Sequence, residues 1–357
     1  MVSVFLPIGK SFTSITRIPA ACSAVSGPGC FLLENTMKRI PRNRTLTCTE
    51  AELLSFSTHL LQLTQPISSD SLTDCIVNQD LEQALQFLPT RFVDLLIMDP
   101  PYNLTKNYNG HVFRSREAHE YISWFDNILS SLLPILRPNA SLYVCSDWRT
   151  SNILFPVLDK YFHVRNRITW EREKGRGAKT NWKNNTEDIW FCTVGNDYCF
   201  NVDDVKLKRR VIAPYRSEDG KPKDWEESRN GNFRLTYPSN LWSDITIPFW
   251  SMPENTDHPT QKPEKLIAKL VLASSNTGDL VFDPFIGSGT TAVVARKLNR
   301  RFVGIELNRE YCCWAVKRLM QSEVDKSIQG YADGVFWERN SLNDQKIERG
   351  KQSESHQ

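Results

Sequence analysis

The sequence contains no apolar run near the ~20 residues that a membrane-spanning helix needs, and its mean hydropathy is -0.42. We therefore expect no membrane association. An excess of one charge is also missing, because 44 basic residues face 41 acidic ones and leave a formal net charge of +3. The whole-chain charge does not establish a polyanionic partner, so a nucleic-acid function needs local evidence.

The nine cysteines show no metal-binding or disulfide pattern. None forms a Cys-x-x-Cys pair, and Cys312 and Cys313 are adjacent, which suits neither a zinc site nor an easy bridge. We expect them to be reduced and mostly buried, as in a cytoplasmic protein. We predict no metal centre.

Residues 1–45 lack the continuous apolar core of a secretory signal and hold no acid before Glu34. We interpret them as a flexible extension, or as sequence upstream of a true start at Met37, with an organellar transit peptide as the alternative. Order is expected to begin near Thr49, which forms a capping box with Glu52. The helix that it opens is predicted to continue to Leu63.

Short apolar runs alternate with helical stretches along much of the remaining chain. The predicted strands are 75–78, 93–98, 142–145, 167–170, 189–194, 280–282 and 302–305, and the predicted helices are 121–136, 263–274 and 290–298. This alternation predicts an α/β fold, with a doubly wound, mostly parallel sheet covered on both faces. Residues 196–256 interrupt it with dense charge and many turn residues, so we interpret them as an insertion.

A chemically distinctive run, Asp99-Pro100-Pro101-Tyr102, directly follows one buried strand. Ligands bind beyond the carboxyl ends of strands in open parallel sheets, so these residues are expected at the edge of a cleft. The Asp99 carboxylate and an outward Pro100 carbonyl would form two acceptors matched to an NH2 group, and Tyr102 offers a flat face to a planar base. The alternative is a rigid turn with an ordinary surface acid.

A strand, a glycine turn and a helix form a second unit over residues 279–298. Its candidate ligand-binding residues are Asp283, Phe285, Gly287, Ser288, Gly289 and Thr290. Such a turn directs backbone N–H groups and a helix N-terminus at a ligand. Glu306 ends the next strand, where an acid can accept both hydrogen bonds of a ribose diol. No lysine follows the glycines, so we predict a nucleoside site without an obligatory phosphate.

Two further segments are less specific. Residues 257–265 open the helix before the glycine unit, and His258 there is interpreted as structural, with a cofactor-contacting loop as the functional alternative. The stretch 165–183 holds seven Arg and Lys residues against two Glu, with Trp170 and Trp182 near its ends. It predicts either a clamp on backbone phosphates or a solvated loop.

Together these motifs resemble the S-adenosylmethionine-dependent DNA amino-methyltransferases of the beta group, of the restriction-modification type. The run from Asp99 to Tyr102 resembles their catalytic tetrapeptide, and residues 283–291 resemble their cofactor loop. The tetrapeptide precedes the loop, which is the permuted order of this group. The resemblance covers about residues 74–320.

The resemblance implies a circularly permuted, Rossmann-like methyltransferase fold of about seven strands, one of them antiparallel. The expected parts are a flexible extension (1–45), the catalytic half (46–195), a target-recognition insertion (196–256), the cofactor-binding half (257–322) and a polar C-terminal tail (323–357).

The resemblance also implies the site. Asp99, Pro100, Pro101 and Tyr102 would be catalytic, and S-adenosyl-L-methionine would contact Asp80, Lys262, Asp283, Phe285, Gly287, Ser288, Gly289, Thr290 and Glu306. The substrate would be a base flipped out of double-stranded DNA. A cognate restriction endonuclease would share the recognition site without needing to bind this chain.

Several alternatives stay open at this stage. Adenine N6 is favoured as the target because Asp occupies the first position of the tetrapeptide, but cytosine N4 is also an exocyclic amine. An RNA or protein-glutamine methyltransferase would place the glycine loop first, and a non-catalytic nucleotide-binding module would not need Asp99 or Tyr102. No Pro-Cys dipeptide occurs, so the nucleophile of cytosine C5 methylases is absent.

Overall fold

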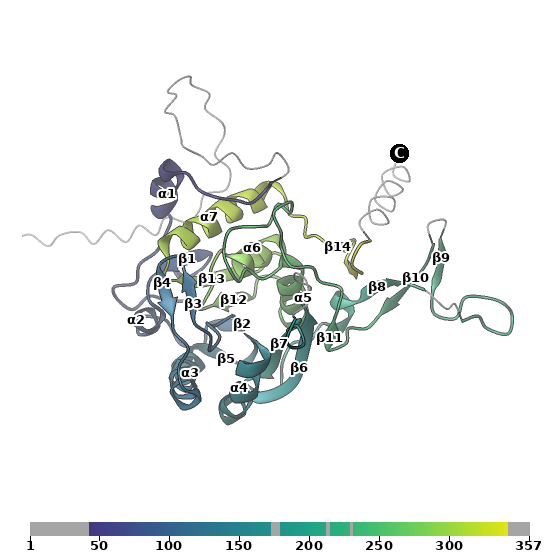
Figure 1. The fold of residues 1–357 in the computed structure, drawn as a ribbon, viewed down its shortest axis with the longest axis horizontal. Helices are drawn as coiled ribbons and strands as arrows, with labels where there is room; N and C mark the ends of the chain where they lie inside the picture. Colours follow the sequence, from purple (N-terminus) through teal and green to yellow (C-terminus); the bar gives the residue numbers. More distant parts are fainter. Residues whose placement is uncertain (1–42, 173–178, 212–214, 229–230, 342–357) are drawn as a thin grey trace, which may run out of the picture.

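An eight-stranded sheet forms the centre of the molecule (Figure 1). The computed structural model describes residues 43–172, 179–211, 215–228 and 231–341. The strand order is β1-β13-β12-β2-β5-β7-β6-β11. The bounds are β1 Cys75–Asn78, β2 Val93–Met98, β5 Leu136–Ser146, β6 His163–Glu171, β7 Thr186–Thr193, β11 Leu241–Trp242, β12 Leu280–Asp283 and β13 Arg301–Glu306.

Only β7 runs against its neighbours in this sheet, pairing antiparallel with both β5 and β6. The other pairings are parallel, which confirms the predicted α/β class with one antiparallel strand. The eighth strand, β11, has two residues and comes from the insertion. Because β2, β12 and β13 are parallel neighbours, the tetrapeptide, the glycine turn and Glu306 follow strands that end at one edge.

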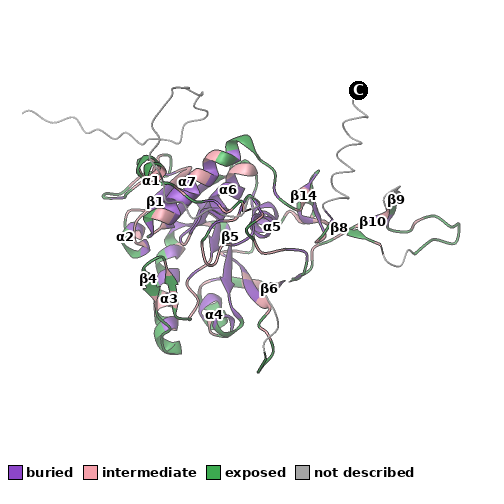
Figure 2. Ribbon diagram, turned by 45° about the horizontal axis from the view of Figure 1, so that its top comes forward, coloured by how far each residue is buried: buried purple, intermediate pink, exposed green. Residues whose placement is uncertain are grey.

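Three helices pack on each face of the sheet (Figure 1). One face carries α2 (Leu81–Leu85), α3 (Ala118–Leu132) and α4 (Trp148–Tyr161), and the other carries α5 (Glu264–Ser274), α6 (Thr290–Lys297) and α7 (Arg309–Val324). Figure 2 shows the buried residues concentrated in the sheet and its inner helices. Covering both faces explains the nearly continuous apolar strands, such as β2 and β12.

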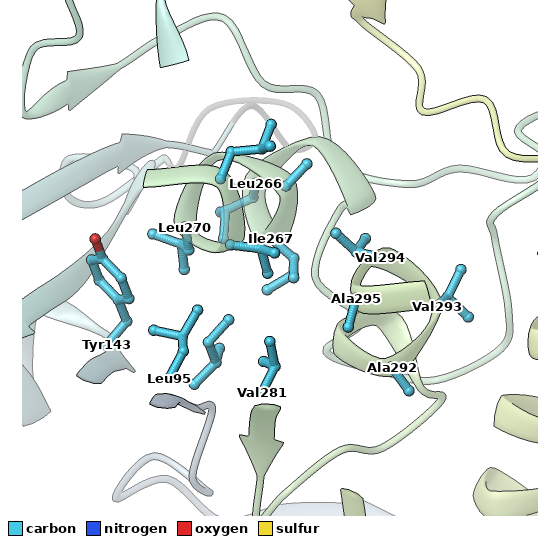
Figure 3. Packing of buried hydrophobic residues seen from close by; sticks show 14 of the residues in the cluster. Leu95, Tyr143, Leu266, Ile267, Leu270, Val281, Ala292, Val293, Val294 and Ala295 are labelled. Carbon is cyan, nitrogen blue, oxygen red and sulfur yellow. The ribbon is translucent and has the colours of Figure 1, made fainter. Parts of the chain in front are cut away.

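Helix α5 is buried along its whole length. Its Ile267 and Leu270 point toward Leu95 and Val281 of the sheet, whereas Leu266 extends to the other side of the helix (Figure 3). Full burial of each such side chain contributes about 1.5–3 kcal/mol, so this helix fixes the position of the segment that precedes it.

Inserted residues, together with two short strands near the C-terminus, build a second sheet of five strands that extends to one side of the body (Figure 1). Its order is β14-β15-β8-β10-β9, with β8 Leu207–Arg210, β9 Glu226–Ser228, β10 Gly231–Thr236, β14 Tyr331–Ala332 and β15 Val335–Trp337. Two lysines of α5 attach this region to the body, because Lys265 and Lys269 bind Asp244 at 2.7 and 2.8 Å.

The C-terminal region corrects one expected boundary. Residues 323–357 were expected to be a polar tail, but α7 continues to Val324, and β15 pairs in parallel with β8 of the insertion. Phe336 and Trp337 are buried. The apolar residues here are few and isolated in sequence, so their burial depends on a sheet that the local pattern does not reveal.

Other short elements complete the fold. Helix α1 (Glu50–Ser57) has the predicted capping box, but it ends at Ser57, and Leu61 instead forms a bridge with Val77. The helix predicted to reach Leu63 is therefore too long. The remaining elements are the hairpin β3 (Lys106–Tyr108) and β4 (His111–Phe113) and the 3-10 turns Leu133–Ile135 and Val202–Val205. No helix within the described ranges is long and apolar enough to cross a membrane.

Candidate active site

A cavity of about 480 Å³ opens at the edge where β1, β2 and β13 end. This volume is in the range of small-molecule sites in proteins. Eight of the predicted site residues line it: Asp80, Asp99, Pro100, Pro101, Tyr102, Phe285, Gly287 and Glu306. Tyr108 and Phe113 of the β3–β4 hairpin, together with Trp124 of α3, add aromatic walls. The fold thus brings both predicted motifs to one cavity.

Glu306 is held at the end of β13 by backbone donors. Its Oε1 accepts from the Asn308 N–H at 2.7 Å, and its Oε2 accepts from the Gly287 N–H at 3.1 Å. Burial raises the pKa of Glu306 to about 7. A carboxylate has about four lone-pair sites, so each oxygen can still accept a hydroxyl from a diol. Asp80 borders the same cavity as the cap of α2, accepting from the Gln83 N–H.

The two glycines of the turn have different roles. Gly287 has φ +52°, and a Cβ there would lie 2.9 Å from Nε2 of His258. Gly289 has φ +84°, and a Cβ there would lie 2.4 Å from the Cβ of Ala315 in α7. Gly287 borders the cavity, whereas Gly289 lets α6 and α7 pack closely behind the turn.

Asp283 lies between the glycine turn and the tetrapeptide. Its Oδ1 accepts from the Phe285 N–H at 3.0 Å and its Oδ2 accepts from the Thr291 hydroxyl. Burial raises the pKa of Asp283 to about 7. It lines a small cavity of about 30 Å³ that it shares with Asp99, Lys262, Ser288 and Thr290. These predicted cofactor residues therefore lie toward Asp99 rather than around the larger cavity.

Asp99 has a partner on each carboxylate oxygen. The Tyr102 hydroxyl donates to Oδ1 at 2.9 Å, and Nζ of Lys262 donates to Oδ2 at 2.6 Å. The Lys262 ammonium also donates to the Tyr102 hydroxyl at 3.1 Å. Lys262 was predicted to contact the cofactor, but in the structure its ammonium group binds Asp99 and Tyr102 of the tetrapeptide. Asp99 retains lone pairs for an N–H donor in the cavity that it borders.

Glu187, which the sequence analysis missed, completes this cluster from the start of β7. Its Oε2 lies 3.4 Å from Nζ of Lys262 and 3.3 Å from the Tyr102 hydroxyl, and its Oε1 accepts from the Arg172 guanidinium. The side chain is only 5% exposed. The available signal was the acid pair Glu187-Asp188 at the start of an apolar strand, since buried carboxylates need partners.

His258 packs beside an aromatic ring at the border of the two cavities. Its ring contacts Tyr311 edge-on, with centroids 4.5 Å apart, and its Nδ1 accepts from the Thr260 N–H at 3.4 Å. Burial and the nearby Lys262 lower the pKa of His258 to about 3, so the ring is neutral at neutral pH. It borders both cavities as an uncharged wall.

The basic stretch 165–183 does not act as one unit. Arg165 donates to Thr193, Gly195 and Asn196 at the far end of β7, and Arg172 binds Glu187. Residues 173–178 lie outside the described residues. Trp182 is 95% exposed. The clamp therefore stays a prediction for the outer part of the segment alone.

These features define a class of protein. A mostly parallel sheet with β7 reversed carries a glycine turn and Glu306 beside a partly buried Asp99–Tyr102 pair, all at its carboxyl edge. Within the described residues no group of His, Cys, Asp or Glu could hold a metal ion. The fold and the site are those of a Rossmann-like methyltransferase.

Comparison with known proteins supports this class. A DNA methylase family model, that of the N6/N4 methyltransferases, matches residues 93–317. DNA adenine methyltransferase YhdJ of Escherichia coli K12 is 33% identical over 253 residues, covering 68% of this chain and 82% of YhdJ. Type II methyltransferase M.HpaI of Haemophilus parainfluenzae is 32% identical over 240 residues, covering 66% and 71%.

A solved structure agrees in fold. PvuII DNA methyltransferase (cytosine-N4-specific) matches with a TM-score of 0.51 at 18% identity, over 71% of this chain and 90% of that one. The chain belongs to the family of S-adenosylmethionine-dependent DNA amino-methyltransferases.

Proposed function

We propose that the chain methylates N6 of adenine at a specific site in double-stranded DNA. The observation that carries the proposal is the position of Asp99. Its carboxylate lies between the Tyr102 hydroxyl and the Lys262 ammonium and borders the same cavity as Glu306. An acceptor for an amine and an acceptor for a ribose thus share one cavity.

The residues around the cavity suit S-adenosylmethionine. Glu306 is a partly buried carboxylate with free lone pairs for the ribose hydroxyls, and Asp80 and Phe285 add a polar and an aromatic wall for the nucleoside. Asp283 and the turn at Gly287 lie between this part and Asp99. When bound, the cofactor supplies an electrophilic methyl group.

Asp99 and Tyr102 then act on the base. The base leaves the DNA stack so that its amine can reach Asp99, and the Tyr102 ring offers a stacking face. As the amine nitrogen forms a bond to the methyl carbon, it gains positive charge, which the fixed Asp99 carboxylate stabilises. Pro100 and Pro101 restrict the backbone so that this geometry is in place before the base arrives.

Adenine is the proposed base because Asp stands first in the tetrapeptide and because the E. coli relative is named an adenine methyltransferase. Cytosine N4 is the alternative, since the structural relative PvuII methyltransferase is named cytosine-N4-specific. Both bases present an exocyclic NH2 to the same acceptor, so the catalytic residues serve either one.

The second sheet is the proposed reader of the DNA sequence. Its strand β8 carries Lys208, Arg209 and Arg210, and Leu235 and Tyr237 nearby are at least half exposed. Basic residues bind phosphates, while side chains that reach the groove read the bases. Because M.HpaI is a type II methyltransferase, we further propose that the chain modifies DNA in the cytoplasm. A companion restriction endonuclease would recognise the same DNA sequence without needing to bind this chain.

Expression in a host without DNA methylation tests this function. Nucleosides from the host DNA would be analysed by mass spectrometry, and the modified positions would be mapped by sequencing that detects methylated bases. We expect N6-methyladenine in one sequence context with the native chain and none with Asp99→Ala. N4-methylcytosine would establish the alternative base, and unmodified DNA with a soluble native chain would contradict the proposal.

A further inference from the structure

Lys262 and Glu187 have no role in the function proposed above, although both belong to the cluster around Asp99. The Lys262 ammonium contacts both carboxylates, at 2.6 Å from Asp99 and 3.4 Å from Glu187. Its side chain is 7% exposed, and those of Glu187 and Asp99 are 5% and 18% exposed. Burying three charged groups is costly unless their contacts compensate, so this arrangement needs an explanation.

The charges in this cluster balance in pairs. Arg172 binds Glu187 from the end of β6, and Lys262 binds Asp99 from the segment before α5. Burial alone would lower the pKa of Lys262, but Asp99 and Glu187 raise it above its ordinary value. Lys262 is therefore a fixed cation and cannot serve as a proton acceptor at neutral pH.

We propose that Lys262 is a positioning residue that keeps Asp99 ionised and correctly aimed, and that Glu187 holds Lys262 in place while Asp99 binds the substrate amine. The inference rests on the proposed function. The Asp99 carboxylate must accept hydrogen bonds from Lys262, Tyr102 and the incoming N–H group at the same time. A second carboxylate on Lys262 keeps the ammonium compensated as its bond to Asp99 weakens.

The transfer step itself is unchanged by this proposal. The lone pair of the amine nitrogen forms the N–C bond, the C–S bond breaks with its electron pair moving to sulfur, and the alkylated amine loses one proton to solvent. An ionised Asp99 is needed because a protonated one does not balance the charge that appears on nitrogen. Lys262 and Glu187 act only through Asp99 and Tyr102.

Several titratable or charged groups surround Asp99 and bear on how the rate of methyl transfer responds to pH. They are Lys262, Tyr102, Glu187 with Arg172 behind it, Cys145 of β5, Asp283 of β12, Tyr108 of β3 and Tyr121 of α3. Burial raises the pKa of Cys145 and of the three tyrosines, so these groups stay neutral near pH 7. Lys262 is the cation in direct contact with Asp99.

Single-turnover methyl transfer from labelled cofactor to duplex DNA, measured against pH at saturating cofactor, tests the inference. Lys262→Met keeps the length and burial of the side chain but removes the charge. We expect its rate near pH 7 to fall about 100-fold and the acid limb of its pH profile to move up by about one unit or more. Lys262→Arg should restore much of the rate and of the native pH profile. Glu187→Gln should lower the rate about 10-fold.

Lys269→Met is the matched control, because Lys269 is another buried lysine on a carboxylate, bound to Asp244 at 2.8 Å. Loss of the Lys269 charge should lower stability yet leave the pH profile of methyl transfer native. A native rate and profile for folded Lys262→Met would overturn the inference, as would a loss confined to cofactor affinity. Native protein that transfers no methyl group to any DNA would instead contradict the proposed function.

Discussion

In the proposed function, Asp99 assists methyl transfer while it is ionised, fixed and accessible to the substrate amine. Tyr102 and Lys262 provide the first two conditions, and the cavity provides the third. The side chains that set these conditions come from β2, β7 and the segment before α5, which are far apart in sequence. The ionisation and orientation of Asp99 therefore depend on contacts that form only when the chain folds.

Removing the Asp99 carboxylate should slow the chemical step far more than it weakens cofactor binding. Stabilisation of developing charge by one fixed group is typically worth about 3–4 kcal/mol, so Asp99→Ala should lower the single-turnover rate at least ~100-fold. Methyl transfer from labelled cofactor to duplex DNA would measure the rate, and calorimetry the cofactor affinity. Transfer at the native rate would show that the assigned site is wrong.

Glu306 should matter for the cofactor instead. Loss of a charged acceptor for two hydroxyls costs about 1.5–3 kcal/mol, so Glu306→Ala should weaken S-adenosylmethionine binding about 10- to 150-fold. Titration calorimetry on the folded variant would measure this. Native affinity would remove Glu306 from the ribose site.

The raised pKa of Glu306 also affects stability without cofactor. Its pKa is about 7 when folded and 4.5 as the ordinary value, so between these pH values the folded state holds a proton that the unfolded state has released. Stability contributed by this group must fall as pH rises from about 4.5 to 7. Glu306→Gln lacks this loss, so its stability relative to the native chain should improve over that range. Urea unfolding at pH 5, 6 and 7 would detect it; a constant difference would contradict the burial effect.

At this scale the sequence predicted the residues whose types are chemically distinctive. Asp99, Tyr102 and Glu306 follow strands, and the rule that ligands bind at strand ends brings them to one cavity. Glu187 lies at the start of its strand rather than at the end. It reaches the same edge only because β7 is reversed, and the family pattern does not say which side chain of a reversed strand points inward.

Among the elements, the strands were predicted better than the helices. β1 and β2 match the predicted bounds, because runs buried on both faces stay apolar throughout. Helices α4 and α7 were not predicted. α4 contains Pro156, and α7 buries Arg318, which donates to Ser288, Thr290 and Glu264. A buried arginine interrupts the apolar pattern of a helix, so a prediction from apolar periodicity alone misses it.

Close packing of α6 and α7 predicts a measurable effect at Gly289. An alanine there would place its Cβ against Ala315 and would hold an L residue at φ +84°, so Gly289→Ala should lose about 1–3 kcal/mol to steric overlap beyond the backbone strain. Gly278→Ala is the control, because Gly278 has φ +86° with nothing within 4 Å of the added Cβ. Urea unfolding of both variants compares them. Equal losses would mean that α7 adjusts to the added methyl group.

At the scale of the whole molecule, buried residues of β15 join the second sheet to the body. The Trp337 ring packs edge-on against Phe233 of β10, with centroids 5.8 Å apart, and the Trp337 carbonyl accepts from Lys265 of α5. The second sheet is therefore fastened to the helix that packs behind the active site. Under the proposed function, a few side chains therefore link the sheet that would contact DNA to the body.

Truncating Trp337 should loosen that connection. Loss of a buried tryptophan typically costs about 3–5 kcal/mol, so Trp337→Ala should disorder the second sheet before it affects the body. We expect weaker binding of duplex DNA in fluorescence anisotropy, with cofactor affinity unchanged in calorimetry. If both affinities fall together, the two sheets unfold as one unit; if neither falls, the second sheet does not contact DNA.

The pairing of β15 with β8 also has a consequence for biosynthesis. Phe336 aligns with Leu207, so β8 leaves the ribosome long before its partner strand is made. Residues of the cofactor site, up to Glu306, and the helix α7 that packs behind the glycine turn emerge first. A nascent chain can therefore assemble the proposed cofactor pocket while the sheet proposed to read DNA is still incomplete, because non-local strand pairing waits for both partners. Under the proposed function, methyl-donor binding would thus become possible during synthesis before target selection.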